Sequence, residues 1–175
     1  MGQSVLNFLL NDNYKVRLML SIPIREGERP KTTNTNPHEQ LNQNPDSEAY
    51  ESFKAKLFHF NDTSRRPSII SVPGSEALWL NEGIACNCKN GFMIGREFAH
   101  IHPAYDGSLH MALSQRDFDE VLNKQWGEKH PLAGMHSIPD TIVMVYAPRN
   151  DAEMDVVLSI VKASLKNAKK LTGEE

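Results

Sequence analysis

A strong turn signal divides one histidine-rich stretch of this chain into two short strands. Asp106-Gly107 is typical of a tight turn, and the residues on both sides of it favour extended structure, so the chain is expected to fold back as an antiparallel hairpin. Successive side chains of a strand alternate between its two faces, which places His100 and His102 on one face and His110 roughly across from them. The hairpin therefore predicts three imidazoles on one patch of a sheet.

Three converging imidazoles suit several kinds of chemistry. They can bind a metal ion, relay protons or hold an anionic substrate, because histidine titrates near neutral pH without help. His110 shares its face with Ser108 and Ala112, whose small side chains leave room for a ligand. The alternative interpretation is a set of half-buried polar side chains bonded to the backbone.

The acidic residues near the hairpin do not complete a metal site of two histidines and one carboxylate. Glu97 is expected to point away from the face that His100 and His102 share, and Asp106 is expected to serve the turn. A His-x-His pair with one distant histidine can still cap one face of an iron, zinc or manganese ion and leave positions open. Metal binding by His100, His102 and His110 and metal-free base catalysis therefore both remain open.

Hydrophobic spacing predicts helices and strands around this hairpin. Helices are expected where a capping residue precedes apolar side chains at helical spacing, over about residues 47–60, 115–126 and 151–165, the second of them ended by Gly127. Strands are expected at residues 68–72, 77–80 and 141–147. This order predicts an α+β fold, a single domain with a mixed or antiparallel sheet in which the histidine hairpin packs against several helices.

Residues 25–46 are almost wholly polar and cannot build a core. They include three prolines, and Leu41 is their only large aliphatic side chain. A segment of this length without secondary structure is a lid, a binding loop, a surface wrap or disorder. We therefore divide the chain into an N-terminal segment (1–24), a polar loop or disordered insertion (25–46) and a core (47–175), with one domain overall.

Composition limits the partners and the compartment. The chain has 19 basic and 22 acidic side chains and a net charge of −3, so nucleic acid is not an expected partner. Cys86 and Cys88, one residue apart, are expected to be free thiols, which predicts a cytoplasmic protein. The apolar run at residues 5–10 is too short to span a membrane and lacks the basic flank of a secretory signal.

Several short blocks, taken in their order and spacing, resemble the fungal luciferase family, whose enzymes oxidise a hydroxy-pyrone luciferin with molecular oxygen. The likeness is good over about residues 96–165, includes one earlier block, and is poor over residues 32–95. The blocks are Arg25-Glu26-Gly27 with Arg29-Pro30, Arg96-Glu97, Ala99-His100 with His102, Leu109-His110, Ala112-Leu113, Glu120-Val121-Leu122, Trp126-Gly127, His130-Pro131-Leu132-Ala133-Gly134 and Tyr146-Ala147-Pro148-Arg149-Asn150.

The resemblance implies an oxygenase-type oxidoreductase of the kind used in bioluminescence. Its substrate would be a phenolic or pyrone-like enol, with O2 as co-substrate, and a peroxide intermediate would collapse with loss of carbon dioxide. The enolate must form first, which requires a base with a pKa near neutrality, and histidine fits that task. The catalytic candidates are His100, His102, His110 and His130, with either no cofactor or one divalent ion of iron, zinc or manganese.

Four further residues are candidates for substrate binding. Arg149 can pair with an enolate or carboxylate oxygen, or form a salt bridge with Asp151 or Glu153. Tyr146 and Trp126 can stack on a flat substrate or pack in the core. Arg96 can bind substrate or pair with a surface acid. His130, already a catalytic candidate, can close the pocket or pack within its loop.

Two other functions remain open. One is a small-molecule-binding or structural member of the same family without catalysis, and the other is a metal-dependent hydrolase or isomerase. The chain lacks Gly-rich phosphate loops and nucleophile elbows, which argues against nucleotide enzymes and α/β-hydrolases.

Overall fold

The computed structural model describes residues 20–135 and 137–169, which form three helices and one six-stranded sheet. In chain order the elements are α1 (Ser47–Leu57), β1 (Thr63–Pro67), β2 (Glu76–Leu80), β3 (Glu97–Ile101), β4 (Leu109–Ala112), α2 (Gln115–Asn123), β5 (Gly127–Lys129), β6 (Ile142–Val145) and α3 (Asp151–Ala168). The strand order is β1-β2-β3-β4-β6-β5, and every neighbouring pair is antiparallel. The predicted α+β fold is confirmed.

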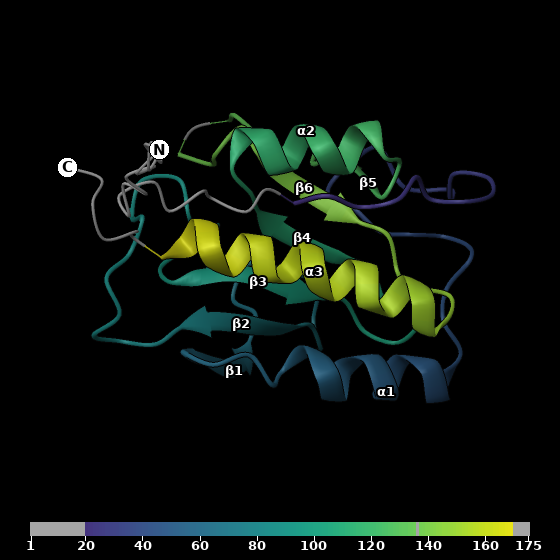
Figure 1. The fold of residues 1–175 in the computed structure, drawn as a ribbon, viewed down its shortest axis with the longest axis horizontal. Helices are drawn as coiled ribbons and strands as arrows, with labels where there is room; N and C mark the ends of the chain where they lie inside the picture. The colour runs from purple at the N-terminus through teal and green to yellow at the C-terminus, as the bar shows by residue number, and fades with distance from the viewer. Residues whose placement is uncertain (1–19, 136, 170–175) are drawn as a thin grey trace, which may run out of the picture.

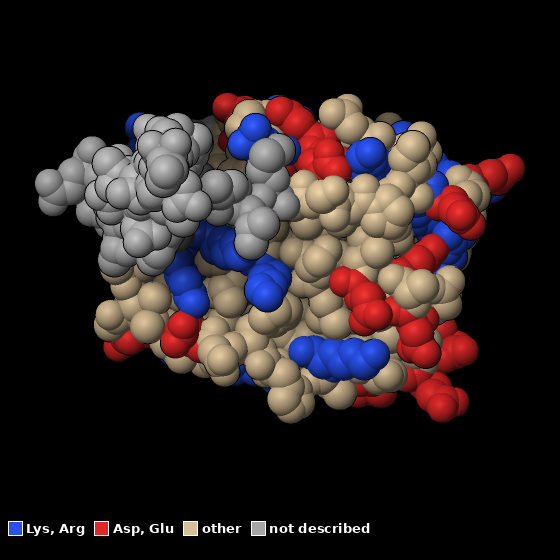
Figure 2. All heavy atoms as spheres, viewed as in Figure 1, with Lys and Arg blue, Asp and Glu red and all other residues tan. Residues whose placement is uncertain are grey.

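The longest helix, α3, crosses the middle of the sheet over β3 and β4, and α1 and α2 flank it (Figure 1). Each helix begins at a side chain that accepts a hydrogen bond from a backbone N–H of the first turn, as Asn150 does from Glu153 (3.0 Å). Acidic and basic side chains both occur on the helix-covered face, separated by uncharged residues (Figure 2). None of the described helices is long and apolar enough to cross a membrane, and residues 5–10 lie outside the described residues.

The middle strands have one apolar face and one polar face. Leu109 and Met111 of β4 are fully buried in the core that α3 covers. The residue between them, His110, points to the opposite face because side chains alternate along a strand. His110 lies directly across from His100 of β3 in the sheet register. The predicted hairpin is therefore confirmed, with its histidines on the face turned away from α3.

A β-bulge in β3 changes the direction of its first side chain. Two consecutive residues of β2 lie opposite Glu97 and Ala99, which leaves Phe98 as an extra residue without a partner. The extra residue breaks the alternation, so Glu97 reaches the same side as His100 and is hydrogen bonded to it. The prediction that Glu97 points away from the histidine face is wrong, because it assumed a regular strand.

Residues 25–46 pack against the body of the protein as a loop. Gln40 Oε1 accepts from the backbone N–H of Ala147 (3.0 Å), and Asn44 Nδ2 donates to the carbonyl of Asp106 (2.9 Å). Gln40 is buried although it belongs to this polar segment. Of the alternatives that the sequence left open, the structure shows a packed loop.

Two predicted element boundaries are wrong. Residues 68–72 form turns, because Ser68 Oγ accepts from the N–H groups of Ile70 (3.4 Å) and Ser71 (3.2 Å), and the strand lies before them. Helix α2 ends before Gly127, which instead opens β5. A Cβ atom at Gly127 would lie 2.1 Å from the carbonyl oxygen of Met144, so glycine is needed there for close approach of two strands.

Candidate functional site

Five histidines of the described chain gather on the face of the sheet opposite α3. His100 and His110 are register partners, His102 follows β3, His130 follows β5, and His38 comes from the polar loop. Their neighbouring ring centroids are 4.5 Å apart for His110 and His130 and 5.5 Å apart for His100 and His102. All of these rings except that of His130 are almost completely buried.

These histidines form two groups of three that share His110. One group is His100, His102 and His110, and the other is His38, His110 and His130. Within each group, one nitrogen from each ring lies within 4.8 Å of the others. The structure thus brings together all four predicted catalytic histidines and adds His38 to them.

Buried carboxylates fix the orientation of two rings. Nδ1 of His100 donates to Glu97 Oε1 (2.8 Å), and Nδ1 of His102 donates to Asp106 Oδ2 (2.5 Å). The backbone N–H of Ser108 donates to the other oxygen of Asp106 (2.9 Å). Because each Nδ1 carries the proton, each Nε2 keeps a lone pair. Asp106 therefore serves both the predicted turn and the ring of His102.

A third carboxylate holds His38. Nε2 of His38 donates to Glu128 Oε1 (2.8 Å), which leaves Nδ1 of His38 buried and without a hydrogen-bond partner in the described structure. Thr32 Oγ1 donates to the same Glu128 oxygen (2.8 Å), and the hydroxyl of Tyr146 donates to the other (2.8 Å). The ring of His38 is thus fixed with an unused acceptor nitrogen.

His130 has the opposite arrangement. The backbone N–H of Leu132 donates to Nδ1 of His130 (3.0 Å), so the neutral ring carries its proton on Nε2. Among the rings whose hydrogen bonds define a tautomer, His130 is therefore a donor at Nε2, while His100 and His102 are acceptors there. The predicted roles of His130 as acid or pocket-closing residue remain compatible with this geometry.

Burial controls the charge of the cluster. Burial lowers the pKa of His100 and, together with the neighbouring imidazoles, lowers that of His110 well below its usual range and that of His130 to about 4. Burial alone would raise the pKa of Glu128, but hydrogen bonds from His38, Tyr146 and Thr32 lower it to about 2. These three rings are consequently neutral near pH 7 beside a charged Glu128.

The histidines line a cavity of about 700 Å³. Its rim includes apolar side chains that are partly exposed, with Ile70 46% and Ile94 39% exposed. The described lining is Asn36, Pro37, His38, Ile70, Ser71, Val72, Met93, Ile94, Gly95, His100, His102, His110, His130, Leu132, Ser137, Ile138 and Ile142. A buried polar floor below an apolar mouth is the usual form of a small-molecule site.

The four predicted substrate-binding residues do not line this cavity, because each is held elsewhere. Arg149 forms the salt bridge with Glu153 that the sequence left open, and also donates to the carbonyl of Glu26 (2.8 Å). The indole of Trp126 donates to the carbonyl of Pro23 (2.7 Å) within the core.

The other two predicted substrate-binding residues, Arg96 and Tyr146, also form hydrogen bonds away from the cavity. Arg96 donates to the carbonyls of Leu80 (2.9 Å), Asn81 (2.8 Å) and Ile84 (2.7 Å). Tyr146 is buried and bonded to Glu128, so it reaches the cavity only through the Glu128–His38 pair. The predicted stacking of Tyr146 on a substrate has no support in this arrangement.

Three residues of the site were missed by the sequence reasoning. His38 lies in a polar stretch with no periodicity, Glu97 is redirected by the bulge, and Glu128 lies in a very short strand. For His38 the sequence offers no local signal. For Glu97, the available signal was the presence of an acidic residue three positions before His100. That spacing brings the two side chains together only because of the bulge.

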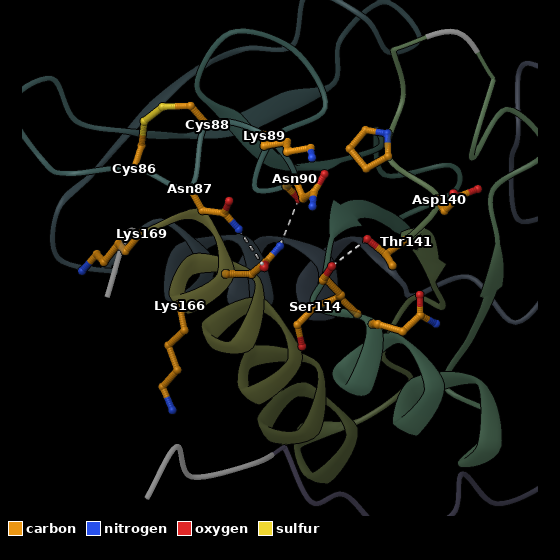
Figure 3. Close-up of a pocket in the computed structure, with 14 residues that line it drawn as sticks. Cys86, Asn87, Cys88, Lys89, Asn90, Ser114, Asp140, Thr141, Lys166 and Lys169 are labelled. Atoms are coloured by element: carbon orange, nitrogen blue, oxygen red, sulfur yellow. Dashed lines mark hydrogen bonds between the residues drawn. A yellow bond between two sulfur atoms is a disulfide. The ribbon is translucent and has the colours of Figure 1, made fainter. Parts of the chain in front are cut away.

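A second hollow of similar volume, about 680 Å³, lies at the C-terminal end of α3 (Figure 3). Its polar side chains mainly satisfy one another and the backbone, as Asn167 does with Asn90 (3.2 Å) and Asn87 (3.4 Å). Cys86 and Cys88 lie at its edge joined by a disulfide, so the prediction of free thiols is wrong. This hollow lacks the histidine chemistry of the first.

The fold and the cluster define a class: an α+β domain with a histidine-floored cavity opposite its helices. Comparison with known proteins then identifies the relatives. Residues 95–164 match the family model described as the luciferase domain. The chain is 35% identical to a luciferase of Armillaria ostoyae and 34% identical to one of Neonothopanus nambi, over alignments of 167 residues that cover 86% of this chain and 62% of each relative.

The resemblance to the fungal luciferase family is therefore confirmed: residues 95–164 match its luciferase domain, and the chain is similar to luciferases of Armillaria species. The aligned part spans 62% of the length of these curated relatives. No solved structure matches the chain.

Proposed function

We propose that this protein is a luciferase-like oxygenase that adds O2 to an enolic small molecule of the hydroxy-pyrone type. The observation that carries the proposal is the cavity of about 700 Å³, which combines a buried histidine floor with an apolar mouth. Its volume is in the range of sites for small organic molecules. The relation to luciferases supports the choice of oxygen chemistry over hydrolysis or isomerisation.

The proposed reaction begins with removal of a proton from the enol hydroxyl. The enolate then forms a carbon–oxygen bond with O2, and the two electrons of that bond reduce O2 to a peroxide attached to the substrate. The outer peroxide oxygen adds to the neighbouring lactone carbonyl, and the C–O bond between that carbonyl carbon and the ring oxygen breaks. The ring oxygen leaves as an enolate and takes back the proton that the base removed. The O–O bond and the bond between the carbonyl carbon and the peroxide-bearing carbon then break together, carbon dioxide leaves, and the product keeps the other oxygen atom as a carbonyl. All atoms of O2 are thereby accounted for, and no further oxidant is needed.

His38 is the best placed base for the first step. Its Nδ1 is buried, lines the cavity and has no hydrogen-bond partner among the described residues. Glu128 fixes the ring through Nε2 and can stabilise the imidazolium that forms when Nδ1 takes the proton. A base oriented by a carboxylate in this way is the usual arrangement for proton abstraction.

The remaining histidines have complementary proposed roles. His130, with its proton on Nε2, can donate a hydrogen bond to a developing oxyanion or peroxide oxygen. His100, His102 and His110 form the deepest part of the floor and hold the reacting end of the substrate, either as a proton-transfer group or as metal ligands. The apolar rim suits the flat, weakly polar remainder of a pyrone.

Oxygen uptake with a defined substrate pair tests the proposal. Purified protein is mixed with a hydroxy-pyrone, and O2 consumption, carbon dioxide release and photon emission are recorded together. The same pyrone methylated on its enol oxygen is the substrate control, because it cannot form the enolate. His59→Ala, which changes an exposed histidine that does not line the cavity, is the protein control.

The proposal predicts uptake of O2 and release of carbon dioxide with the free enol and neither with its methyl ether. Photon emission then decides whether the reaction is bioluminescent. Tight binding of the hydroxy-pyrone without any O2 uptake would contradict the oxygenase and support a binding protein without catalysis.

A further inference from the structure

We infer that His100, His102 and His110 hold one divalent transition-metal ion, with Glu97 and Asp106 as outer carboxylates behind two of the ligands. This site deepens the proposed oxygenase and rests on it for its catalytic meaning. Binding of the ion, however, can be measured without any turnover.

The three rings have the spacing of a ligand set. Their nitrogens lie within 4.8 Å of one another, and Nε2 of His100 is 3.1 Å from Nδ1 of His110. Two nitrogens that bind one ion at about 2.1 Å are roughly 3 to 3.4 Å apart, depending on coordination geometry. Only small side-chain movements are needed to place an ion among all three rings.

The outer carboxylates orient the lone pairs toward the ion. Glu97 and Asp106 each accept the Nδ1 proton of one ring, His100 and His102 respectively. Glu97 is itself held by the hydroxyl of Ser68 (2.8 Å). Metal-binding histidines nearly always donate their second ring N–H to a carboxylate or carbonyl, which fixes the tautomer and increases the basicity of the ligand.

Charge balance supports a cation here. Glu97 and Asp106 are fully buried, and the partners found for them in the described part of the chain are hydroxyl, backbone N–H and imidazole groups, without a lysine or arginine. Two buried carboxylates without a compensating positive charge are unfavourable. A divalent ion beside His100 and His102 would neutralise both.

The tautomers distinguish this group from the second one. His130 uses Nδ1 to accept from Leu132, so its Nε2 carries a proton and cannot bind an ion in the neutral ring. The group of His38, His110 and His130 therefore lacks one of its three lone pairs. The group of His100, His102 and His110 has the two that its carboxylates fix. Nδ1 of His110 donates to Nε2 of His100 (3.1 Å) in the structure, and His110 completes the set when its proton moves to Nε2.

Metal binding also gives His110 a defined second function. When its Nδ1 binds the ion, the proton of the neutral ring lies on Nε2, which is buried and without a partner among the described residues. The nearby Nδ1 of His38 is an equally unpartnered acceptor. The cavity floor then offers one donor and one acceptor to a bound enol.

The donor set limits the kind of ion. Three imidazole nitrogens suit zinc, iron, cobalt or nickel, whereas magnesium and calcium prefer oxygen ligands. Three protein ligands leave at least one coordination position open, as in catalytic sites and unlike closed structural sites. The substrate oxygen of an enolate is a suitable ligand for that position.

Metal titration of the 175-residue chain tests the site. Protein stripped with a chelator is titrated with Zn²⁺ or Co²⁺, with bound metal measured by elemental mass spectrometry and the cobalt absorption spectrum. We expect about one ion per chain for the wild type and for His130→Ala. His102→Ala should lose the ion, and Asp106→Asn should weaken binding about 10- to 100-fold.

His130→Ala is the matched control, because it removes a histidine of the same cavity that lies outside the ligand set. Circular dichroism verifies that each variant is folded, and Asp106→Asn carries the test if His102→Ala does not fold. Failure of folded wild-type protein to bind either ion, or equal loss of binding in His130→Ala and His102→Ala, would overturn the assigned site. Metal binding without O2 uptake would leave the site standing and contradict only the proposed oxygenase.

Discussion

Two adjacent pairs of residues in the middle of the sheet have opposite surroundings. Ala99 and Met111 face α3 and are packed in the apolar core, whereas His100 and His110, one position along, face the cavity. Both pairs belong to the same two strands and the same register. The difference shows how one hairpin can supply stability from one face and chemistry from the other.

The two faces depend on different interactions. The helix-covered face is stabilised by non-directional burial of apolar area, which tolerates small changes in shape. The histidine face depends on directional bonds from Glu97, Asp106 and Glu128, and on the polar loop that brings His38. Substitutions on the first face should therefore change stability, and substitutions on the second should change activity more than stability.

The largest expected effect is on the histidine face. His38→Ala removes the proposed base and should lower the rate of O2 uptake at saturating hydroxy-pyrone about 100- to 10,000-fold. His59→Ala serves as the exposed-histidine control and should retain the wild-type rate. If His38→Ala consumed O2 at the wild-type rate, His38 would not be the base, and the loop would only cover the cavity.

The next effect is on the helix-covered face. Leu109→Ala leaves a cavity under α3 and should lower the free energy of unfolding by about 2–5 kcal/mol, measured by urea denaturation. The number of metal ions bound by the folded variant should not change. If Leu109→Ala abolished metal binding in folded protein, the two faces would not be independent.

A smaller effect tests whether the polar loop belongs to the fold. Gln40→Ala leaves the buried N–H of Ala147 without its acceptor and should cost about 1–3 kcal/mol of unfolding free energy. Leu41→Ala, at the exposed neighbouring position, is the matched control and should be close to neutral. Equal stability of both variants would indicate that the loop contributes little to the folded state.

The last prediction concerns the pH dependence of stability that comes from Glu128, whose pKa is lowered from 4.5 to about 2. The unfolded chain binds this proton first as the pH falls, so the contribution of Glu128 is complete above pH 4.5 and is lost between pH 4.5 and pH 2. Glu128→Gln should therefore have a flatter dependence of unfolding free energy on pH in that window. Parallel curves for variant and wild type would contradict the lowered pKa.

The sequence predicted the elements that follow from local pattern. The hairpin at Asp106-Gly107, the cap at Asn150 and the strand within residues 141–147 all depend on spacing and turn chemistry, and all are confirmed. The convergence of His100, His102 and His110 follows from the same alternation of side chains. Gly127 was misplaced because a glycine after a helix resembles a helix end, although close strand packing requires it here.

Other features of the site depend on tertiary structure and have no local pattern. A single extra residue, Phe98, redirects Glu97, and no hydrophobic periodicity reveals it. His38 reaches the cluster through bonds between the loop and distant residues such as Glu128, 90 positions further along the chain. Arg149 pairs with a nearby acid, Glu153, which is one of the alternatives that the sequence left open for it.

His38 enters the cavity on a loop outside residues 95–164, the part that matches the luciferase family. In the described structure, one isolated β-bridge, between Thr32 and Gln40, joins the two sides of that loop. Substitution of the residues that lie between Thr32 and Gln40 therefore breaks few backbone hydrogen bonds of the sheet. Substitutions in this loop are therefore expected to change which molecules the cavity accepts while the histidines of the sheet stay in place. A library of variants at residues 33–37 and 39, with the proposed base His38 kept, is accordingly the shortest route to a changed substrate preference.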